Sequence, residues 1–515
     1  MGDVEKAYPA KSFGDMYPCR SKEEIAETAR HLVLAKLVYF FVFAADASWE
    51  PFAAYFLSTR NINTGMIGIL LTVMTISNAI VGQILTAIAD HYNVHKSVAL
   101  SSFALFVALT CSMYFSNDFW WTAVIGVLAQ CAWGPVLPML DNVTVQMVQG
   151  TNEDYSKQRL WAAISWAIFC LGDGWVMERR GPNSILEVMG FAGLIALGLM
   201  WHYPFDKYSS KALGAERRRQ EEAEQAAAAA FTTTAASNPN DGEGDASAAS
   251  PVMPTTATPA ADVEEEWCGF LNAPCRLISS NPLMLPFLSI IMCIGYLFGT
   301  IDGYLALWVV ELGGSSGLVG AMYALASLVE IPLFFHSDKV YRWAGMRAIL
   351  FISCGAYLVR VVSYSMLQDP FMVLFVEPFH ALTIALFWGP CVTYMNDVLL
   401  CHTPELKATG QGSFFASFYT GRSIGYSLAG WLSDIGGMRF MFKTTLIAVG
   451  VLIVLVANFW RIEHILIRRT LAHSRSMLDF SLGADSSSSD SNDETSTLLG
   501  KKSNKAQHAH PVPRQ

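Results

Sequence analysis

The chain has 515 residues, of which 53% are hydrophobic and only 15% charged, whereas soluble chains carry about a quarter charged residues. The net charge of −9 comes largely from a central acidic segment and the C-terminal tail, and it does not point to nucleic acid. The ten cysteines are scattered, and no Cys-x-x-Cys pair, Walker loop, nucleophile elbow or His-Glu-x-x-His motif occurs. We therefore expect a protein that holds no metal or cofactor, does not use ATP to drive transport and is not an enzyme.

The apolar residues form long runs, each near the roughly 20 residues that a helix needs to cross a bilayer. Only helices and closed barrels satisfy their backbone groups in lipid, and runs of this length exclude barrel strands. The sequence predicts an all-α membrane protein with twelve transmembrane helices in two six-helix halves. The predicted spans are 32–58, 64–88, 97–115, 119–143, 159–178, 185–203, 284–310, 316–335, 346–368, 370–398, 410–432 and 441–460.

Lys and Arg residues indicate the orientation of these spans. If both termini are cytoplasmic, the inner segments carry 25 of the 34 Lys and Arg residues and the outer loops only five. No cleavable signal peptide is visible, so the first span is expected to direct insertion. The predicted domains are a cytoplasmic N-terminal segment (1–31), an N-terminal half (32–204), a cytoplasmic linker (205–281), a C-terminal half (282–461) and a cytoplasmic tail (462–515).

The linker and the tail are rich in Ala, Ser, Thr, Pro and acidic residues, and we predict that both are disordered. In the tail, Glu494, Leu498 and Leu499 match an acidic dileucine sorting pattern, and sorting adaptors are possible partners. The sequence leaves the plasma membrane and an endolysosomal membrane as alternatives.

The two halves have similar loop sequences after their second helices. Asp90 is followed by a short turn and Lys96, and Asp338 is followed by a similar turn and Arg347. Duplicated six-helix units are common in secondary transporters, in which the substrate lies between the repeats. We predict that these two loops have a role in conformational change.

These features resemble the major facilitator superfamily. The segment at Asp90 is similar to the signature loop of that superfamily, although Thr86, His91 and Asn93 replace a Gly, an Arg and the turn Gly. Asn tolerates the left-handed backbone better than most residues, so a turn remains feasible. The resemblance implies a twelve-helix carrier.

Within that superfamily, both halves resemble the lactose permease-like oligosaccharide:proton symporters and their eukaryotic MFS-associated-domain relatives. Pro138-Met139-Leu140-Asp141 is followed by Arg159 eighteen residues later and by Trp166 seven further on, as in the sugar site of that family. The resemblance also implies a proton-coupling set in the second half. Its members here are Asp302, Glu330, Arg360 and His380.

The proton-coupling set departs from the family in one respect. The family carries a coupling Glu one turn after its His, where this chain has Thr383, while Glu377 lies one turn before His380. A carboxylate that alternates between water, an Arg and a dry site can take up and release a proton, and His titrates near neutral pH. The alternative for Glu377 is an interhelical polar network that fixes packing.

The strongest candidates for binding a solute are Asp141, Arg159 and Trp166. A charge at mid-membrane costs about 2.5–3.5 kcal/mol, so such residues face a cavity or pair with each other. An Arg can grip hydroxyls or a carboxylate, and a Trp ring can stack on a sugar or a base. The alternative is a structural ion pair with the Trp as packing.

Further buried charges lie elsewhere in the spans. Asp46 and Glu50 are four residues apart, share a helix face, and are predicted either to bind substrate or to lie in water at the outer mouth. Asp173 and Arg422 are additional candidates. Pro135, Pro138, Pro378 and Pro390 are expected to kink spans four and ten, and Gly421, Gly425 and Gly430 to permit close helix contact.

We therefore expect a monomeric secondary transporter of a small polar solute such as a sugar or a nucleoside, driven by a proton gradient. Two alternatives remain open: a transporter-like receptor or scaffold without flux, and a passive uniporter. The substrate itself cannot be identified from the sequence.

Overall fold

The computed structural model describes residues 22–92, 94–115, 117–148, 151, 153, 155–205, 207–208, 276–279, 281–400 and 407–487. Within these ranges the regular elements are helices, as predicted. Most of the predicted linker and the sorting pattern at Glu494, Leu498 and Leu499 lie outside the described residues. The tail was predicted to be disordered, but its described part is helical up to Ser487. Residues from Trp460 onward form a compact unit of their own.

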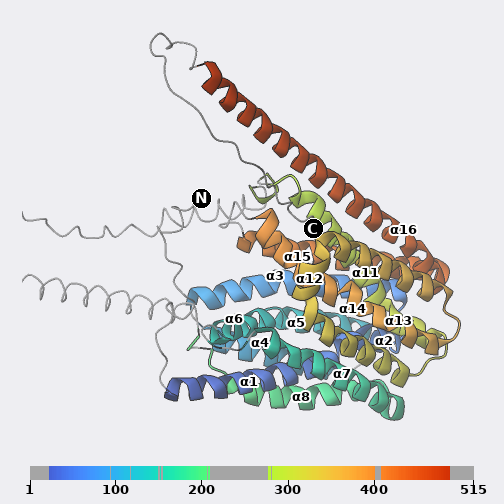
Figure 1. Cartoon of the computed structure of the whole chain (residues 1–515). Coiled ribbons are helices and arrows are strands. Elements are labelled where there is room, and N and C mark those ends of the chain that lie inside the picture. Colours follow the sequence, from blue (N-terminus) through green and yellow to red (C-terminus); the bar gives the residue numbers. More distant parts are fainter. Residues whose placement is uncertain are drawn as a thin grey trace, which may run out of the picture. The chain divides into compact units, whose positions relative to one another are not determined.

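The N-terminal half contains the six predicted spans, and Figure 1 draws its helices in blue to green. Spans one and four each contain two α-helices, and the other four each contain one. The elements are α1 (Lys22–Ala47), η1 (Glu50–Phe52), α2 (Ala53–Ser58), α3 (Thr64–Tyr92), α4 (His95–Ser112), η2 (Met113–Phe115), α5 (Phe119–Trp133), α6 (Val136–Val148), α7 (Tyr155–Arg180) and α8 (Ser184–Trp201).

The C-terminal half begins with α11 and ends with α16. Span ten is divided into short helical pieces. The elements are α11 (Met284–Glu311), α12 (Ser316–Met366), η3 (Pro370–Met372), α13 (Val373–Val376), η4 (Glu377–Phe379), α14 (His380–Thr383), α15 (Ala385–Tyr394), η5 (Met395–Leu399) and α16 (Lys407–Ser487).

Among the described residues, eleven helical stretches are long and apolar enough to cross a membrane. The last, Thr409–Leu466, has 58 residues and contains the non-helical turn of Gly437 (φ 78°, ψ 168°), so it comprises two spans. Gly345 (φ 74°, ψ 163°) bends α12 in the same way. Both backbone conformations favour glycine because they need no Cβ. The predicted six-plus-six arrangement of helices is confirmed.

The structure differs from the prediction at the loop between spans eight and nine. The predicted span ends at residue 335, but helix α12 continues through this segment and bends only at Gly345. The expected kinks are present. Span four is interrupted between Trp133 and Val136, and span ten changes to a 3-10 turn at Glu377–Phe379. A proline lacks the N–H that would continue an α-helix, which explains both interruptions.

Several of the hydrogen bonds that join the two halves lie at one end of the spans. Asp434 of α16 accepts hydrogen bonds from the Thr64 hydroxyl and, at 3.0 Å, from the Gly65 backbone N–H at the start of α3. Ser316 of α12 donates to the Gly174 carbonyl near the end of α7 at 3.1 Å. We call this region, which includes Thr64, Gly174, Ser316 and Asp434, the sealed end.

Close backbone contacts accompany these hydrogen bonds. A Cβ at Gly174 would lie 2.5 Å from the Ser316 carbonyl oxygen and 2.8 Å from the Gly320 Cα. Gly421 and Gly425 pack in the same way against α11, as predicted. Small residues allow helix backbones to approach, which is how helices associate in lipid.

A matched pair of glycine substitutions tests the contact between α7 and α12. Gly174→Ala forces a methyl group against backbone atoms and should lower the free energy of unfolding by about 1–3 kcal/mol. A Cβ at Gly172 would have no atom of the described residues within 4 Å, so Gly172→Ala should be neutral or stabilising by up to about 1 kcal/mol. Chemical unfolding in detergent micelles measures both, and equal effects would contradict the proposed contact.

Candidate functional site

Asp141 and Arg159 meet, as their spacing predicted. Arg159 of α7 donates through Nη1 to Asp141 Oδ2 of α6 at 2.6 Å and to the Tyr155 hydroxyl at 2.8 Å. Tyr39 of α1 donates to the other Asp141 oxygen at 2.6 Å. This cluster ties three helices together. The Arg159 side chain remains 43% exposed and that of Asp141 28%, so water and a solute can reach the pair.

Two aromatic rings extend this cluster. The Arg159 guanidinium lies 5.9 Å from the centroid of the Phe43 ring, and Phe43 lies 6.3 Å from Trp166. Arg159 and Trp166 are seven residues apart, which places them on one face of α7. The arrangement provides hydrogen-bonding groups beside flat apolar surfaces, the combination that ligand sites use.

Asp46 and Glu50 lie in a second cluster, centred on Arg422. Arg422 of α16 donates through Nη2 to Glu50 of η1 and, at 3.3 Å, to Asp302 of α11. Its Nε donates to the Tyr426 hydroxyl at 2.7 Å. Asp46 is buried and lies within the electrostatic reach of both Glu50 and Arg422. Glu50 belongs to the N-terminal half, so this cluster connects the two halves.

The predicted coupling set divides into pairs. Arg360 of α12 and Glu377 of η4 are both buried, with 3.6 Å between Arg360 Nη2 and Glu377 Oε1. Arg360 also donates to the Tyr364 hydroxyl at 3.0 Å and to the Thr383 hydroxyl at 3.1 Å, and Tyr364 donates to Glu377. Thr383, which stands where the resembled family has its coupling Glu, thus completes a packed polar network.

Glu330 and His380 form the other pair. His380 Nε2 lies 3.0 Å from Glu330 Oε1, and their side chains are 18% and 15% exposed. His380 Nδ1 is buried without a hydrogen-bond partner in the described part of the chain. The pair is less enclosed than Arg360 and Glu377, so it is better placed to exchange a proton.

Phe298 of α11 lies between the Arg422 cluster and this pair. Its ring centroid is 5.2 Å from the Arg422 guanidinium and 6.2 Å from the His380 ring. Asp302, predicted to belong with Glu330 and His380, is bound instead by Arg422. The structure therefore places Asp302 in the cluster that joins the halves.

Of the four residues of the predicted conformational loops, two lie near helix ends and two lie inside α12. Asp90 belongs to α3, and Lys96 of α4 lies 5.4 Å from the Trp201 ring. Asp338 and Arg347 flank the Gly345 bend of α12. The role of these residues stays a prediction.

The sequence analysis did not identify the tyrosines that accept hydrogen bonds from the three arginines. Each arginine donates to a tyrosine four residues away on its own helix: Arg159 to Tyr155, Arg360 to Tyr364 and Arg422 to Tyr426. Side chains four apart lie on one helix face. An Arg with a Tyr four positions away inside an apolar run is the signal that would have found them.

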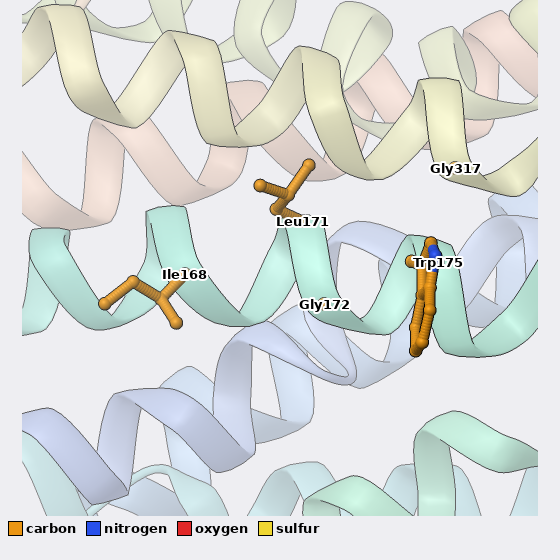
Figure 2. Close-up of a pocket in the computed structure, with 5 residues that line it drawn as sticks. All are labelled: Ile168, Leu171, Gly172, Trp175 and Gly317. Carbon is orange, nitrogen blue, oxygen red and sulfur yellow. The ribbon is translucent and has the colours of Figure 1, made fainter.

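One surface groove is separate from these clusters. It has a volume of about 590 Å³ and is lined by Ile168, Leu171, Gly172, Trp175 and Gly317. Figure 2 shows the first four on α7, beside the α12 backbone at Gly317. The lining is almost wholly apolar, so this groove does not suit a polar solute.

Removing the cation from the Arg422 cluster tests its structural importance. Arg422→Gln leaves Glu50 and Asp302 facing each other, and breaking such a pair costs about 3–5 kcal/mol. We expect the lower end of that range because Glu50 is 34% exposed. Chemical unfolding in detergent measures the loss. Adding Asp302→Asn should restore part of it, Arg342→Gln at an exposed position should have little effect, and a neutral Arg422→Gln would refute the pairing.

Comparisons with known proteins agree on the class of protein. The family described as "MFS_1 like family" matches residues 32–444. A maltose permease of Geobacillus stearothermophilus is 20% identical over 425 residues, which are 82% of this chain and 93% of the permease.

Solved structures agree on the fold. The nucleoside transporter NupG superposes with a TM-score of 0.61 at 14% identity and covers 84% of this chain and 98% of its own. A bacterial homolog of the human lysosomal transporter Spinster gives a TM-score of 0.56 at 13% identity, covering 85% and 97%. The chain therefore belongs to the MFS_1 like family and has the fold of the major facilitator transporters.

Proposed function

We propose that this protein is a proton-coupled secondary transporter of a small polar solute of the sugar or nucleoside type, working by alternating access. The observation that carries the proposal is the partly exposed Asp141–Arg159 pair beside Phe43 and Trp166. The maltose permease and the nucleoside transporter among the similar proteins support this solute class. The carrier would act as a monomer, with the proton gradient as its driving force and no cofactor.

The proposed solute site combines two kinds of recognition. In the described part of the chain, the hydrogen bonds of Arg159 come from Nη1, which leaves Nε and Nη2 to donate to hydroxyls. Asp141 and Tyr155 offer acceptors, and the Trp166 and Phe43 rings offer flat surfaces for a sugar or a base.

The proposed coupling site is the Glu330–His380 pair. A carboxylate and an imidazole 3.0 Å apart can hold a proton between them. The Arg360–Glu377 network is fully buried and well satisfied, which favours a packing role for it.

The proposed orientation places both termini in the cytoplasm. The sealed end then faces away from the cytoplasm, and the Asp141–Arg159 pair opens toward it. The plasma membrane and an endolysosomal membrane remain alternative locations. A receptor without flux and a passive uniporter are the competing functions; flux measurements separate the first, and dependence on a pH gradient separates the second.

The solute site is tested by ligand binding followed by flux. A thermal-shift screen of sugars, nucleosides and small acids on the purified protein identifies a ligand. Arg159→Ala and Asp141→Asn should weaken its binding roughly 100-fold, because truncating a hydrogen-bonded charge pair costs about 2–5 kcal/mol. Arg342→Ala serves as the exposed control. Unchanged affinity in the first two variants would exclude this site.

Coupling is tested with proteoliposomes and an imposed pH gradient. Glu330→Gln removes the acidic group but keeps its shape, so stimulation by the gradient should be lost while exchange of labelled solute across the membrane persists. Wild-type uptake that ignores the pH gradient would rule out coupling altogether. A Glu330→Gln variant that still responds to the gradient would move the coupling group elsewhere.

A further inference from the structure

One carboxyl group inside the bundle has no counter-ion among the residues that the structure describes. Asp173 of α7 is 1% exposed, and both of its carboxyl oxygens are buried without a hydrogen-bond partner in the described ranges. An isolated carboxylate in such a place costs far more than the neutral acid. Burial without a counter-ion therefore favours the neutral, protonated form of this side chain.

The position of Asp173 ties it to the sealed end. The next residue, Gly174, packs against Gly320 and accepts a hydrogen bond from Ser316 of α12. On the other side lies α1, whose Ser48 is the polar neighbour of Asp173. Because Asp173 adjoins this contact in the chain, we expect separation of α7 from α12 to admit water toward its carboxyl group and their closure to exclude it.

Asp173 also lies in line with the proposed solute site. Arg159, Trp166 and Asp173 follow at intervals of seven residues, so they lie along one face of α7, with the first and last about 21 Å apart along its axis. Arg159 is 43% exposed and Asp173 is sealed. One helix thus presents an accessible polar group toward one end and an enclosed acid toward the other.

The titratable groups around Asp173 come from several elements. On α7 itself, Cys170 lies one turn earlier, and its thiol contacts the Ala47 carbonyl of α1 at 3.9 Å. Cys170 is within electrostatic reach of Asp173 and of three other carboxyl groups. These are Asp46 of α1, Glu50 of η1 and Asp302 of α11.

The remaining titratable side chains near this part of α7 have partners of their own. Glu178 of α7 accepts from Ser315 at 3.2 Å, and Glu187 of α8 pairs with Arg180 at 2.8 Å. Tyr323 of α12 donates to the Asp302 carbonyl at 3.3 Å. None of these interactions involves the Asp173 carboxyl.

We propose that Asp173 is a second proton-binding site of this carrier, gated by the contact between α7 and α12. It binds its proton while the sealed end is open, and the neutral acid then allows that end to close. The inference rests on the proposed proton-coupled transport. A proton fits the site better than a metal, because the described residues contain no cluster of three or more His, Cys, Asp or Glu able to hold a cation.

The protonated acid is measured directly by infrared spectroscopy. In difference spectra of the full-length protein recorded during a pH titration, the neutral carboxyl of Asp173 should give a C=O band at a pH where exposed carboxyl groups are ionised. Asp173→Asn should remove that band. Glu187→Gln, which alters a carboxyl group already paired with Arg180, should keep it. A wild-type spectrum without the band, or a band that survives in Asp173→Asn, would overturn the proposal.

Gating is measured by distances between spin labels. In a background in which the ten native cysteines are replaced, labels at Asn183→Cys and Glu311→Cys follow the sealed end. Raising the pH should ionise Asp173 and lengthen this distance. Asp173→Asn should keep it short at every pH. A pair at Tyr92→Cys and Trp343→Cys, both strongly exposed, reports on a distant part of the bundle.

The two experiments need no solute, so they separate this proposal from the proposed function. The band and the pH-dependent distance can be present while uptake does not depend on the pH gradient. That result would support the proton site and contradict coupled transport. If uptake is coupled to the pH gradient but Asp173→Asn behaves as wild type in both measurements, Asp173 is not a proton-binding site and another residue carries the coupling.

Discussion

The structure depends on the cost of placing a charge in hydrocarbon. Three arginines inside the spans are each matched by a carboxylate from another element and a tyrosine from their own helix: Arg159, Arg360 and Arg422. A charge at mid-membrane costs about 2.5–3.5 kcal/mol, and the combined hydrogen bonds offset that cost. Since each carboxylate comes from a different part of the chain, the same bonds decide which helices lie together.

The contacts between the halves combine this electrostatic term with close backbone packing. Glycines at positions 174, 320 and 430 bring helices of the two halves within backbone contact at the sealed end. Such packing is short-ranged, so a small separation removes most of it. The Arg422 cluster, which also spans the halves, includes the longer and more adaptable side chain of Glu50. A seal of this kind can open as a unit.

Much of the fold follows from the sequence, because span length depends only on bilayer thickness. The Asp141–Arg159 pair was also predictable, since helices joined by a short loop lie side by side. The bond between Arg422 and Glu50, 372 positions apart, was not. Helical periodicity assigns a residue to a face of its own helix, whereas docking of the halves decides which faces meet. The helical continuation of α12 to Gly345 was missed because a polar segment outside the membrane has no hydrophobic signature.

The three arginines differ in burial, and this difference separates their proposed roles. Arg360 is 3% exposed and its partner Glu377 2%. Separating them would leave buried charges without their partners, which costs a large amount of free energy. Arg159, at 43%, can exchange partners with water or a solute at little cost. Arg422, at 13%, lies between these limits and bridges both halves. A carrier needs one rigid element, one exchangeable contact and one bond that changes with conformation. Arg360, Arg159 and Arg422 fit these three requirements in that order.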